Sequence, residues 1–262
     1  MNKLALPAHV WAPPLLAGVV LFLVWQGAIN VAGVPPYLLP SPAAVLAACW
    51  REKGALFSAA GHTGSSALLG FGCAVVGAAL MALLLTSSRW VKAALYPWVL
   101  VMQMTPVVAL IPIFVIWFGA GLPSITAISF LISFFPVVAS TTLGLVSTER
   151  GMLDLFTVNQ ATKLQELLLL RVPFALPYFL TGVKIAASLA PIGAISGEFL
   201  AGTEPNTLGY LLIMFRSDPG KMPEVFAVAL VSCVVGFLFI GAVQVLSWLL
   251  LRHWHESAVR PE

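Results

Sequence analysis

The sequence predicts an all-α, polytopic membrane protein with about six transmembrane helices. Of the 262 residues, 60% are hydrophobic and only 9% are charged, whereas soluble domains carry roughly 25% charged residues. So few charges could not cover a water-soluble fold of this size, and the apolar surface must therefore face lipid. Long apolar runs also recur along the chain, and a bilayer core about 30 Å thick needs roughly 20 apolar residues in one helix.

Six apolar runs are long enough to cross a bilayer, and we expect residues 1–262 to form a single transmembrane domain. The runs are residues 11–31, 62–87, 91–118, 123–147, 174–201 and 224–251. The first run follows Lys3 as the apolar part of a signal peptide would, but it continues to about Val34 without a clean small-x-small cleavage site. We therefore interpret it as a retained helix.

Three prolines interrupt the third run, at Pro97, Pro106 and Pro112. Proline removes a backbone donor and kinks a helix. Inside a membrane such a break persists only where neighbouring helices or a water-lined cavity satisfy the freed carbonyl groups. We therefore expect a kinked third helix in the interior of the bundle.

Lysine and arginine residues near the ends of the runs predict the orientation, because they accumulate on the cytoplasmic side. With the N-terminus inside, eight of the 13 basic residues lie inside and four outside, while Lys184 falls within the fifth run. The inside set is Lys3, Arg89, Lys92, Arg150, Lys163, Arg171, Arg252 and Arg260, and the outside set is Arg51, Lys53, Arg216 and Lys221. This bias predicts that both termini are cytoplasmic.

The segment 34–60 is expected on the outer surface. Ser41 can cap a helix whose first position is Pro42. Apolar residues then recur at helical spacing at Ala43, Leu46, Ala47 and Trp50. The pattern predicts an interfacial helix, with a plain loop as the alternative.

The segment 148–172 is the longest polar stretch between two runs, and it falls on the cytoplasmic side. A connection of this length in a compact protein is usually functional. We expect two short helices with a turn near residues 160–162, to which a soluble partner could dock. The alternative is a solvated connector.

Motifs before, at the end of and after this segment resemble a known family. The motifs are TPVVALIP at 105–112 with WFG at 117–119, FFPV at 134–137, VPFALPY at 172–178, TGVKIA at 181–186, IGA at 192–194, GEF at 197–199 and LGYL at 208–211. Together they resemble the permease subunits of ABC importers, in the subgroup for nitrate, taurine, alkyl sulfonates and thiamine-type pyrimidine precursors. The resemblance covers about Pro40 to the C-terminus and implies the type I ABC importer permease fold in the inner membrane.

The cytoplasmic loop of that family usually reads Glu-Ala-Ala, three residues, Gly, and Leu-Pro further on. Here Asp154 takes the Glu position, Leu155 and Phe156 replace the alanines, and Gln160 replaces the glycine. The resemblance implies a coupling helix that fits a groove on the ATPase, and the two bulky residues would need a matching groove. The implied ATPase-coupling residues are Asp154, Leu155, Phe156, Asn159, Gln160, Ala161 and Thr162.

Two physical arguments also favour docking at this segment. A carboxylate such as Asp154 is stabilised near a helix start by the helix dipole. Apolar residues in an exposed loop, here Leu155, Phe156 and Val158, cost solubility unless a partner covers them. The alternative is that they pack beneath the membrane domain.

Four polar residues within the runs could line the substrate pathway. A charged side chain at the bilayer centre costs about 2.5–3.5 kcal/mol on insertion scales, which singles out Glu198 beyond the apolar run 185–195. A structural role and a gate or substrate role are both open for it. Gln103, Thr105 and Ser133 are further candidates, although hydroxyl groups in membrane helices often bond their own backbone or a neighbouring helix.

No catalytic or metal-binding pattern is present, so the sequence does not predict an enzyme. The nucleotide-binding pattern G-x-x-x-x-G-K-[ST] is also absent, so no cofactor is expected on this chain and ATP would be used by a partner. A net charge of +3 does not suggest nucleic acid.

The resemblance implies four partners: a cytoplasmic ATPase, an external solute-binding protein, a second and identical permease chain, and membrane lipid. The favoured solute is a thiamine-type pyrimidine precursor, with taurine, sulfonate or nitrate as the other possibilities. The alternative class is an ATP-independent secondary transporter or channel. It would need paired intramembrane charges or an inverted repeat, and only Lys184 and Glu198 approach the first requirement.

Overall fold

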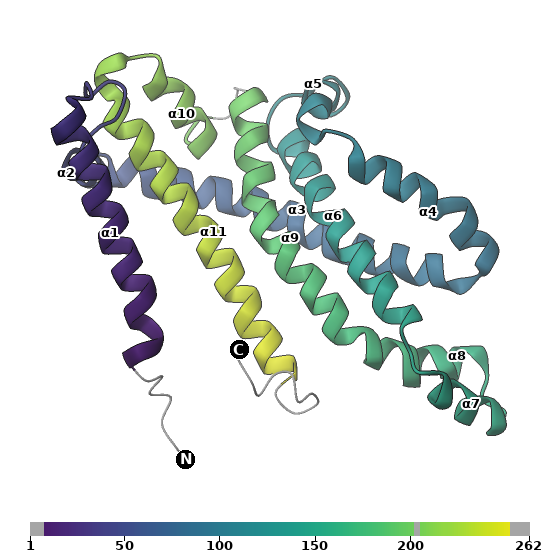
Figure 1. The fold of residues 1–262 in the computed structure, drawn as a ribbon. Helices are drawn as coiled ribbons and strands as arrows, with labels where there is room; N and C mark the ends of the chain where they lie inside the picture. Colours follow the sequence, from purple (N-terminus) through teal and green to yellow (C-terminus); the bar gives the residue numbers. More distant parts are fainter. Residues whose placement is uncertain (1–7, 202–204, 252–262) are drawn as a thin grey trace.

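The computed structural model describes residues 8–201 and 205–251, and all the regular secondary structure in this part of the chain is helical. The helices are α1 (Ala8–Ala32), α2 (Pro42–Arg51), α3 (Lys53–Ser87), α4 (Arg89–Met104), α5 (Val107–Phe118), α6 (Leu122–Val146), α7 (Arg150–Val158), α8 (Lys163–Glu166), the π-helix η1 (Leu167–Arg171), α9 (Val172–Ala201), α10 (Leu208–Arg216), the 3₁₀ turn η2 (Pro219–Lys221) and α11 (Met222–Leu251). Figure 1 shows α2 and α10 at one end of the bundle and α7 with α8 at the other.

Four of the described helical units are long and apolar enough to cross a membrane. They are Lys53–Ser87, Leu122–Val146, Lys163–Ala201 and Pro219–Leu250, and the bent pair α4–α5 makes a fifth if it counts as one span. The apolar part of α1 within the described residues, Leu16–Val31, is shorter. The all-α polytopic class is therefore confirmed, with four to five of the six predicted spans.

Helices α3, α6 and α9 form the centre of the bundle, and glycines permit their close approach. A Cβ atom on Gly182 of α9 would lie 2.9 Å from the Pro136 carbonyl oxygen of α6. A Cβ atom on Gly193 would lie 2.9 Å from the Ser129 Cα, and one on Gly70 of α3 would lie 2.6 Å from the Ser129 Cβ. Small residues let membrane helices pack backbone to backbone. These glycines on α3 and α9 therefore allow both helices to pack closely against α6.

The predicted disruption of the third run at its prolines is present, but the expectation that this helix lies in the interior was wrong for the single chain. Helices α4 and α5 meet at an angle of 100°, and only Val99 and Ile111 of this pair are buried. The chain breaks at Thr105 and Pro106, where the Thr105 hydroxyl donates to the Val101 carbonyl oxygen at 3.0 Å. This local bond satisfies one of the carbonyl groups that the break frees.

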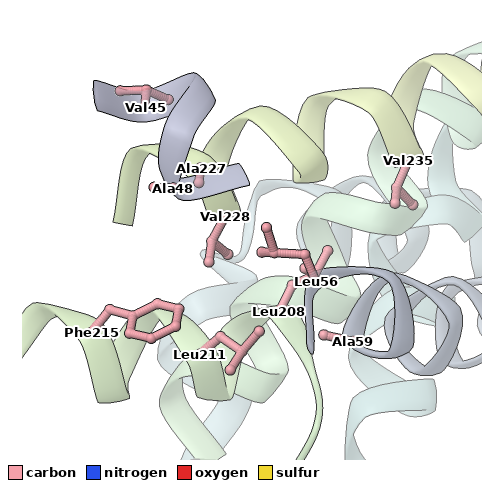
Figure 2. Close-up of a cluster of buried hydrophobic side chains, with 10 residues drawn as sticks. All are labelled: Val45, Ala48, Leu56, Ala59, Leu208, Leu211, Phe215, Ala227, Val228 and Val235. Atoms are coloured by element: carbon pink, nitrogen blue, oxygen red, sulfur yellow. The ribbon is translucent and has the colours of Figure 1, made fainter. Parts of the chain in front are cut away.

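A second cluster joins four helices at the end of the bundle opposite α7. Figure 2 shows buried apolar side chains from α2, α3, α10 and α11 pointing toward one another. The cluster contains Val45, Ala48, Leu56, Ala59, Leu208, Leu211, Phe215, Ala227, Val228 and Val235. Because Leu56 and Ala59 belong to it, α3 begins nine residues earlier than the predicted start at 62.

The predicted surface helix of segment 34–60 exists as α2. The Ala44 amide donates to the Ser41 hydroxyl oxygen at 3.2 Å, and Pro42 is the first helical residue, as expected. An ion pair of 2.6 Å between Arg51 and Glu224 ties α2 to α11. The predicted apolar stripe, represented by Leu46 and Trp50, faces away from the cluster and is exposed, which suits a helix lying at a lipid surface.

Candidate functional site

The predicted coupling segment forms two short helices that project from the end of α6 and return to α9 (Figure 1). Helix α7 carries no buried residue. Its apolar side chains Met152, Leu155 and Val158 are exposed, with Val158 at 80%. Phe156, the third predicted apolar residue, is half-buried, but the exposed side chains do not pack beneath the membrane domain and leave an apolar surface on α7 that a partner could cover.

A tight turn ends α7 and sets the direction of α8. Gln160 has φ +54°, in the left-handed region. Its amide donates to the Thr157 carbonyl oxygen at 3.0 Å, and the Ala161 amide donates to the Phe156 carbonyl oxygen at 3.0 Å. These two bonds define a Schellman motif, in which the left-handed position usually carries glycine. The glycine expected at position 160 therefore has a clear conformational role, which glutamine fills at a cost.

We expect the Gln160→Gly variant to stabilise this turn by about 1 kcal/mol, because a side chain in the left-handed region costs roughly 1–2 kcal/mol. Slower hydrogen exchange of the α7 amides would report the effect. The matched control is Thr157→Gly within α7, which should speed exchange, because glycine in a helix interior costs about 1 kcal/mol. Faster exchange in Gln160→Gly would contradict the assigned geometry.

A capping box begins α8. The Gln165 amide donates to the Thr162 hydroxyl oxygen at 3.2 Å, and the Thr162 amide donates back to the Gln165 side-chain oxygen at 2.8 Å. This reciprocal pair satisfies two donors that a helix start leaves unpaired. The turn and the capping box together fix the angle between α7 and α8.

A π-helical turn connects α8 to α9. Glu166 and Arg171 are five residues apart and form an ion pair of 2.6 Å across this turn. Arg171 also donates to the Leu145 carbonyl oxygen at the end of α6, at 3.5 Å. Arg171 thus links the coupling segment to two core helices. The sequence pattern of an α-helix does not predict the pairing of Glu166 with Arg171, because side chains five residues apart meet in a π-helix and not in an α-helix.

The seven predicted coupling residues lie together in α7, the turn and the start of α8, and most are exposed. Asp154 is the fifth residue of α7, since the helix begins at Arg150. The expectation that it lies near a helix start was therefore wrong, and the helix dipole does not explain its position, because that effect is confined to the first turn. Further apolar residues that the sequence reading missed extend the exposed surface: Met152, Leu164, Leu168 and Leu169.

The predicted pathway residues occupy different environments. Gln103 is exposed on α4, and Thr105 ends that helix. Ser133 is fully buried in α6, and its hydroxyl group has no hydrogen-bond partner within the described residues. No hydrogen bond among the described residues links these three side chains, so the single chain does not assemble them into one site.

Glu198 is buried near the C-terminal end of α9, with 2% of its surface exposed. Its Oε2 atom accepts the Thr63 hydroxyl at 2.9 Å and the Gly209 amide at 3.1 Å. The Thr63 hydroxyl oxygen in turn accepts the Leu208 amide at 3.0 Å. Glu198 and Thr63 therefore hold the start of α10 against α9 and α3, a geometry that favours the structural alternative for Glu198.

An apolar helical bundle with four to five candidate membrane spans and an exposed helical segment at one end is the architecture of a polytopic membrane protein. The family described as binding-protein-dependent transport system inner membrane component matches residues 74–249. The chain belongs to this family, and it is a permease component of an ABC importer rather than an enzyme.

Three relatives illustrate the range of the family. The chain is 37% identical over 247 residues to the formylaminopyrimidine transport permease protein of Halalkalibacterium halodurans, covering 93% of this chain and 96% of that protein. It is 36% identical over 184 residues to the riboflavin transport system permease protein of Chloroflexus aurantiacus, covering 70% and 69%. It is 27% identical over 256 residues to a putative aliphatic sulfonates transport permease protein of Bacillus subtilis, covering 94% and 89%.

These findings confirm the resemblance seen in the sequence. They also argue against the alternative of an ATP-independent transporter or channel, because a binding-protein-dependent system implies an ATPase and a solute-binding protein as partners.

Proposed function

We propose that this permease forms a homodimer, docks two cytoplasmic ATPase subunits through residues 148–172, and imports a thiamine-type pyrimidine precursor. The single observation that carries the docking surface is the exposed apolar side of α7. The pyrimidine precursor is favoured because the formylaminopyrimidine relative matches over nearly the whole chain. The experiment below must distinguish this precursor from four other solutes: riboflavin, sulfonates, taurine and nitrate.

Coupling would use the segment as a rigid lever. The Schellman turn and the capping box fix α7 relative to α8, and Arg171 connects this unit to the ends of α6 and α9. When ATP binding closes the ATPases, a pull on α7 would therefore reach the two core helices together. Such rigid-body motion would open the cavity alternately to the two sides of the membrane.

In this proposal both termini and α7 are cytoplasmic, while α2 and α10 face the binding protein. The orientation rests on the excess of basic residues on one side of the bilayer. The terminal residues that contribute to this count, Lys3, Arg252 and Arg260, lie outside the described residues.

The Asp154→Lys variant tests the docking surface in the reconstituted complex of permease, ATPase and binding protein. Wild type should import formylaminopyrimidine, with weak competition from riboflavin, taurine, aliphatic sulfonates and nitrate. Asp154→Lys should abolish solute-stimulated ATP hydrolysis, because it reverses a charge in the centre of α7, which carries the proposed docking surface. Its melting temperature should stay at the wild-type value, because Asp154 is exposed.

The matched control is Asp154→Glu, which keeps the negative charge at the same exposed position of α7. It should retain most of the stimulated activity. Normal stimulation in Asp154→Lys would remove α7 from the docking site. Import of riboflavin or a sulfonate in preference to formylaminopyrimidine would overturn the substrate but leave the docking surface in place.

A further inference from the structure

Lys184 lies close to the middle of the membrane-crossing part of α9. Helix α9 packs on α6 from Ala175, which lies against Gly144, to Gly197, which lies against Ile125. Residue 186 is the midpoint of that stretch, and at about 1.5 Å per residue Lys184 is roughly 3 Å from it. The ends of the packed stretch lie about 14 Å and 20 Å away on the same scale. A lysine stem can reach water over a short distance, but neither end of the stretch is within that reach.

No counter-charge accompanies Lys184 in the described part of the chain. The two ion pairs found there, Arg51 with Glu224 and Arg171 with Glu166, lie at opposite ends of the bundle. Lys184 itself makes no hydrogen bond or ion pair with a described residue, although it is half-buried. Insertion scales give a lysine at the helix centre one of the highest costs of any residue. A cost of that size, with no local partner, indicates a partner from outside the chain.

The position of Lys184 on α9 indicates where that partner would lie. Thr181, Ile185 and Ile192 are exposed, and with Ser188 they follow one side of the helix. Lys184 stands at the edge of this strip, since it precedes Ser188 by four residues and follows Thr181 by three. The opposite side of α9 is covered by α6 and α3 through Gly182, Gly193 and the adjacent alanines.

The two hydroxyl groups of the strip, on Thr181 and Ser188, do not neutralise the Lys184 ammonium group. Thr181 donates to the Pro177 carbonyl oxygen at 2.9 Å, and Ser188 donates to the Ile185 carbonyl oxygen at 2.7 Å. Both are bonded within their own helix. Each oxygen keeps acceptor capacity but carries no charge, so the strip sets two hydroxyl groups beside the exposed Ile185 and Ile192 and leaves the ammonium charge without a counter-ion.

We propose that Lys184 is a specificity-determining residue, which binds an oxygen acceptor of the transported solute as it passes the middle of the membrane. The acceptor can be the carbonyl oxygen of a formamide or an anionic carboxylate or sulfonate, since an ammonium group donates to each of them. This inference rests on the proposed importer function. In a homodimer, the two copies of Lys184 would offer donors from both sides of the pathway, and lipid would not contact them.

The first experiment measures import in the reconstituted complex with formylaminopyrimidine and taurine as separate probes. Lys184→Met should reduce import about tenfold or more, because hydrogen bonds to charged groups contribute roughly 1.5–3 kcal/mol. Lys184→Arg should restore most of it. Lys53→Met, which removes an exposed lysine outside the packed stretch, is the matched control and should import normally. The probe that the wild type imports identifies the acceptor: a loss of taurine import would mean an anionic acceptor, and a loss of formylaminopyrimidine import would mean a neutral one.

The second experiment does not depend on the choice of solute. In a chain with Cys49, Cys73 and Cys233 changed to serine, Lys184→Cys should react with a charged, water-soluble thiol reagent, whereas Leu238→Cys on the exposed side of α11 should not. Normal import by Lys184→Met, or no reaction at Lys184→Cys, would overturn the inference. Neither result would affect the proposed function, which instead fails if the wild-type chain binds no ATPase.

Discussion

The Glu198→Ala variant should lose about 3 kcal/mol of folding free energy, because leaving a buried donor unpaired costs roughly 1–3 kcal/mol and this variant leaves two. The carboxylate accepts both the Thr63 hydroxyl and the Gly209 amide through one oxygen atom. Removing it also leaves a cavity where α10 meets α9. We expect a clear fall in the melting temperature of the purified chain, measured by intrinsic tryptophan fluorescence.

Glu198→Gln is the matched control, since its amide oxygen can accept the same two hydrogen bonds. It should melt close to wild type and import solute normally. If Glu198 acts instead in the substrate pathway, Glu198→Gln would melt normally but fail to transport. Thr63→Val adds a further check, because the Thr63 hydroxyl group bridges Glu198 and the Leu208 amide. Removing this hydroxyl group should also destabilise the chain, because it leaves the buried Leu208 amide without an acceptor.

The membrane class and most span positions could be predicted because they depend on local composition. A run such as 123–147 agrees with α6 to within one residue at each end, since apolar length alone defines a span. Helix α3 could not be bounded in this way. Its first turns leave the apolar run and are held by Leu56 and Ala59 in a cluster with α10 and α11, which are far away in the sequence.

The break at Thr105 and Pro106 shows a second limit. Prolines in the third run correctly indicated a disruption, but they do not say whether the result is a kink or a 100° bend. That choice depends on whether the freed carbonyl groups find partners locally. Here the Thr105 hydroxyl satisfies one of them, the Val101 carbonyl, a contact that apolar length and proline positions alone do not reveal.

The coupling segment was predictable in outline for a different reason. Thr162 and Gln165 form a capping box that is readable from spacing alone, and the turn before it follows from the family glycine that Gln160 replaces. The π-helical joint was not predictable, because the pairing of Glu166 with Arg171 requires a spacing that an α-helix does not provide.

The Gly182→Leu variant should disrupt the centre of the bundle. A Cβ atom at this position would lie 2.9 Å from the Pro136 carbonyl oxygen, the Ser140 Cβ and the Val137 Cα. Backbone atoms cannot move aside as a flexible side chain can, so α6 and α9 would have to separate. Overpacking a core costs about 1–3 kcal/mol and occasionally more, and we expect the upper end of that range here because leucine adds three further carbons.

The readout is the yield of monodisperse protein in detergent together with its melting temperature. Gly182→Ala should show a smaller loss in the same direction. The matched control is Gly72→Leu, at an exposed position of α3 where nothing lies within 4 Å of an added Cβ atom, and it should behave as wild type. Equal stability of Gly182→Leu and Gly72→Leu would mean that the contact between α6 and α9 does not determine the fold. In that case the lever proposed for coupling would also lose its basis, because it requires these two helices to move as one unit.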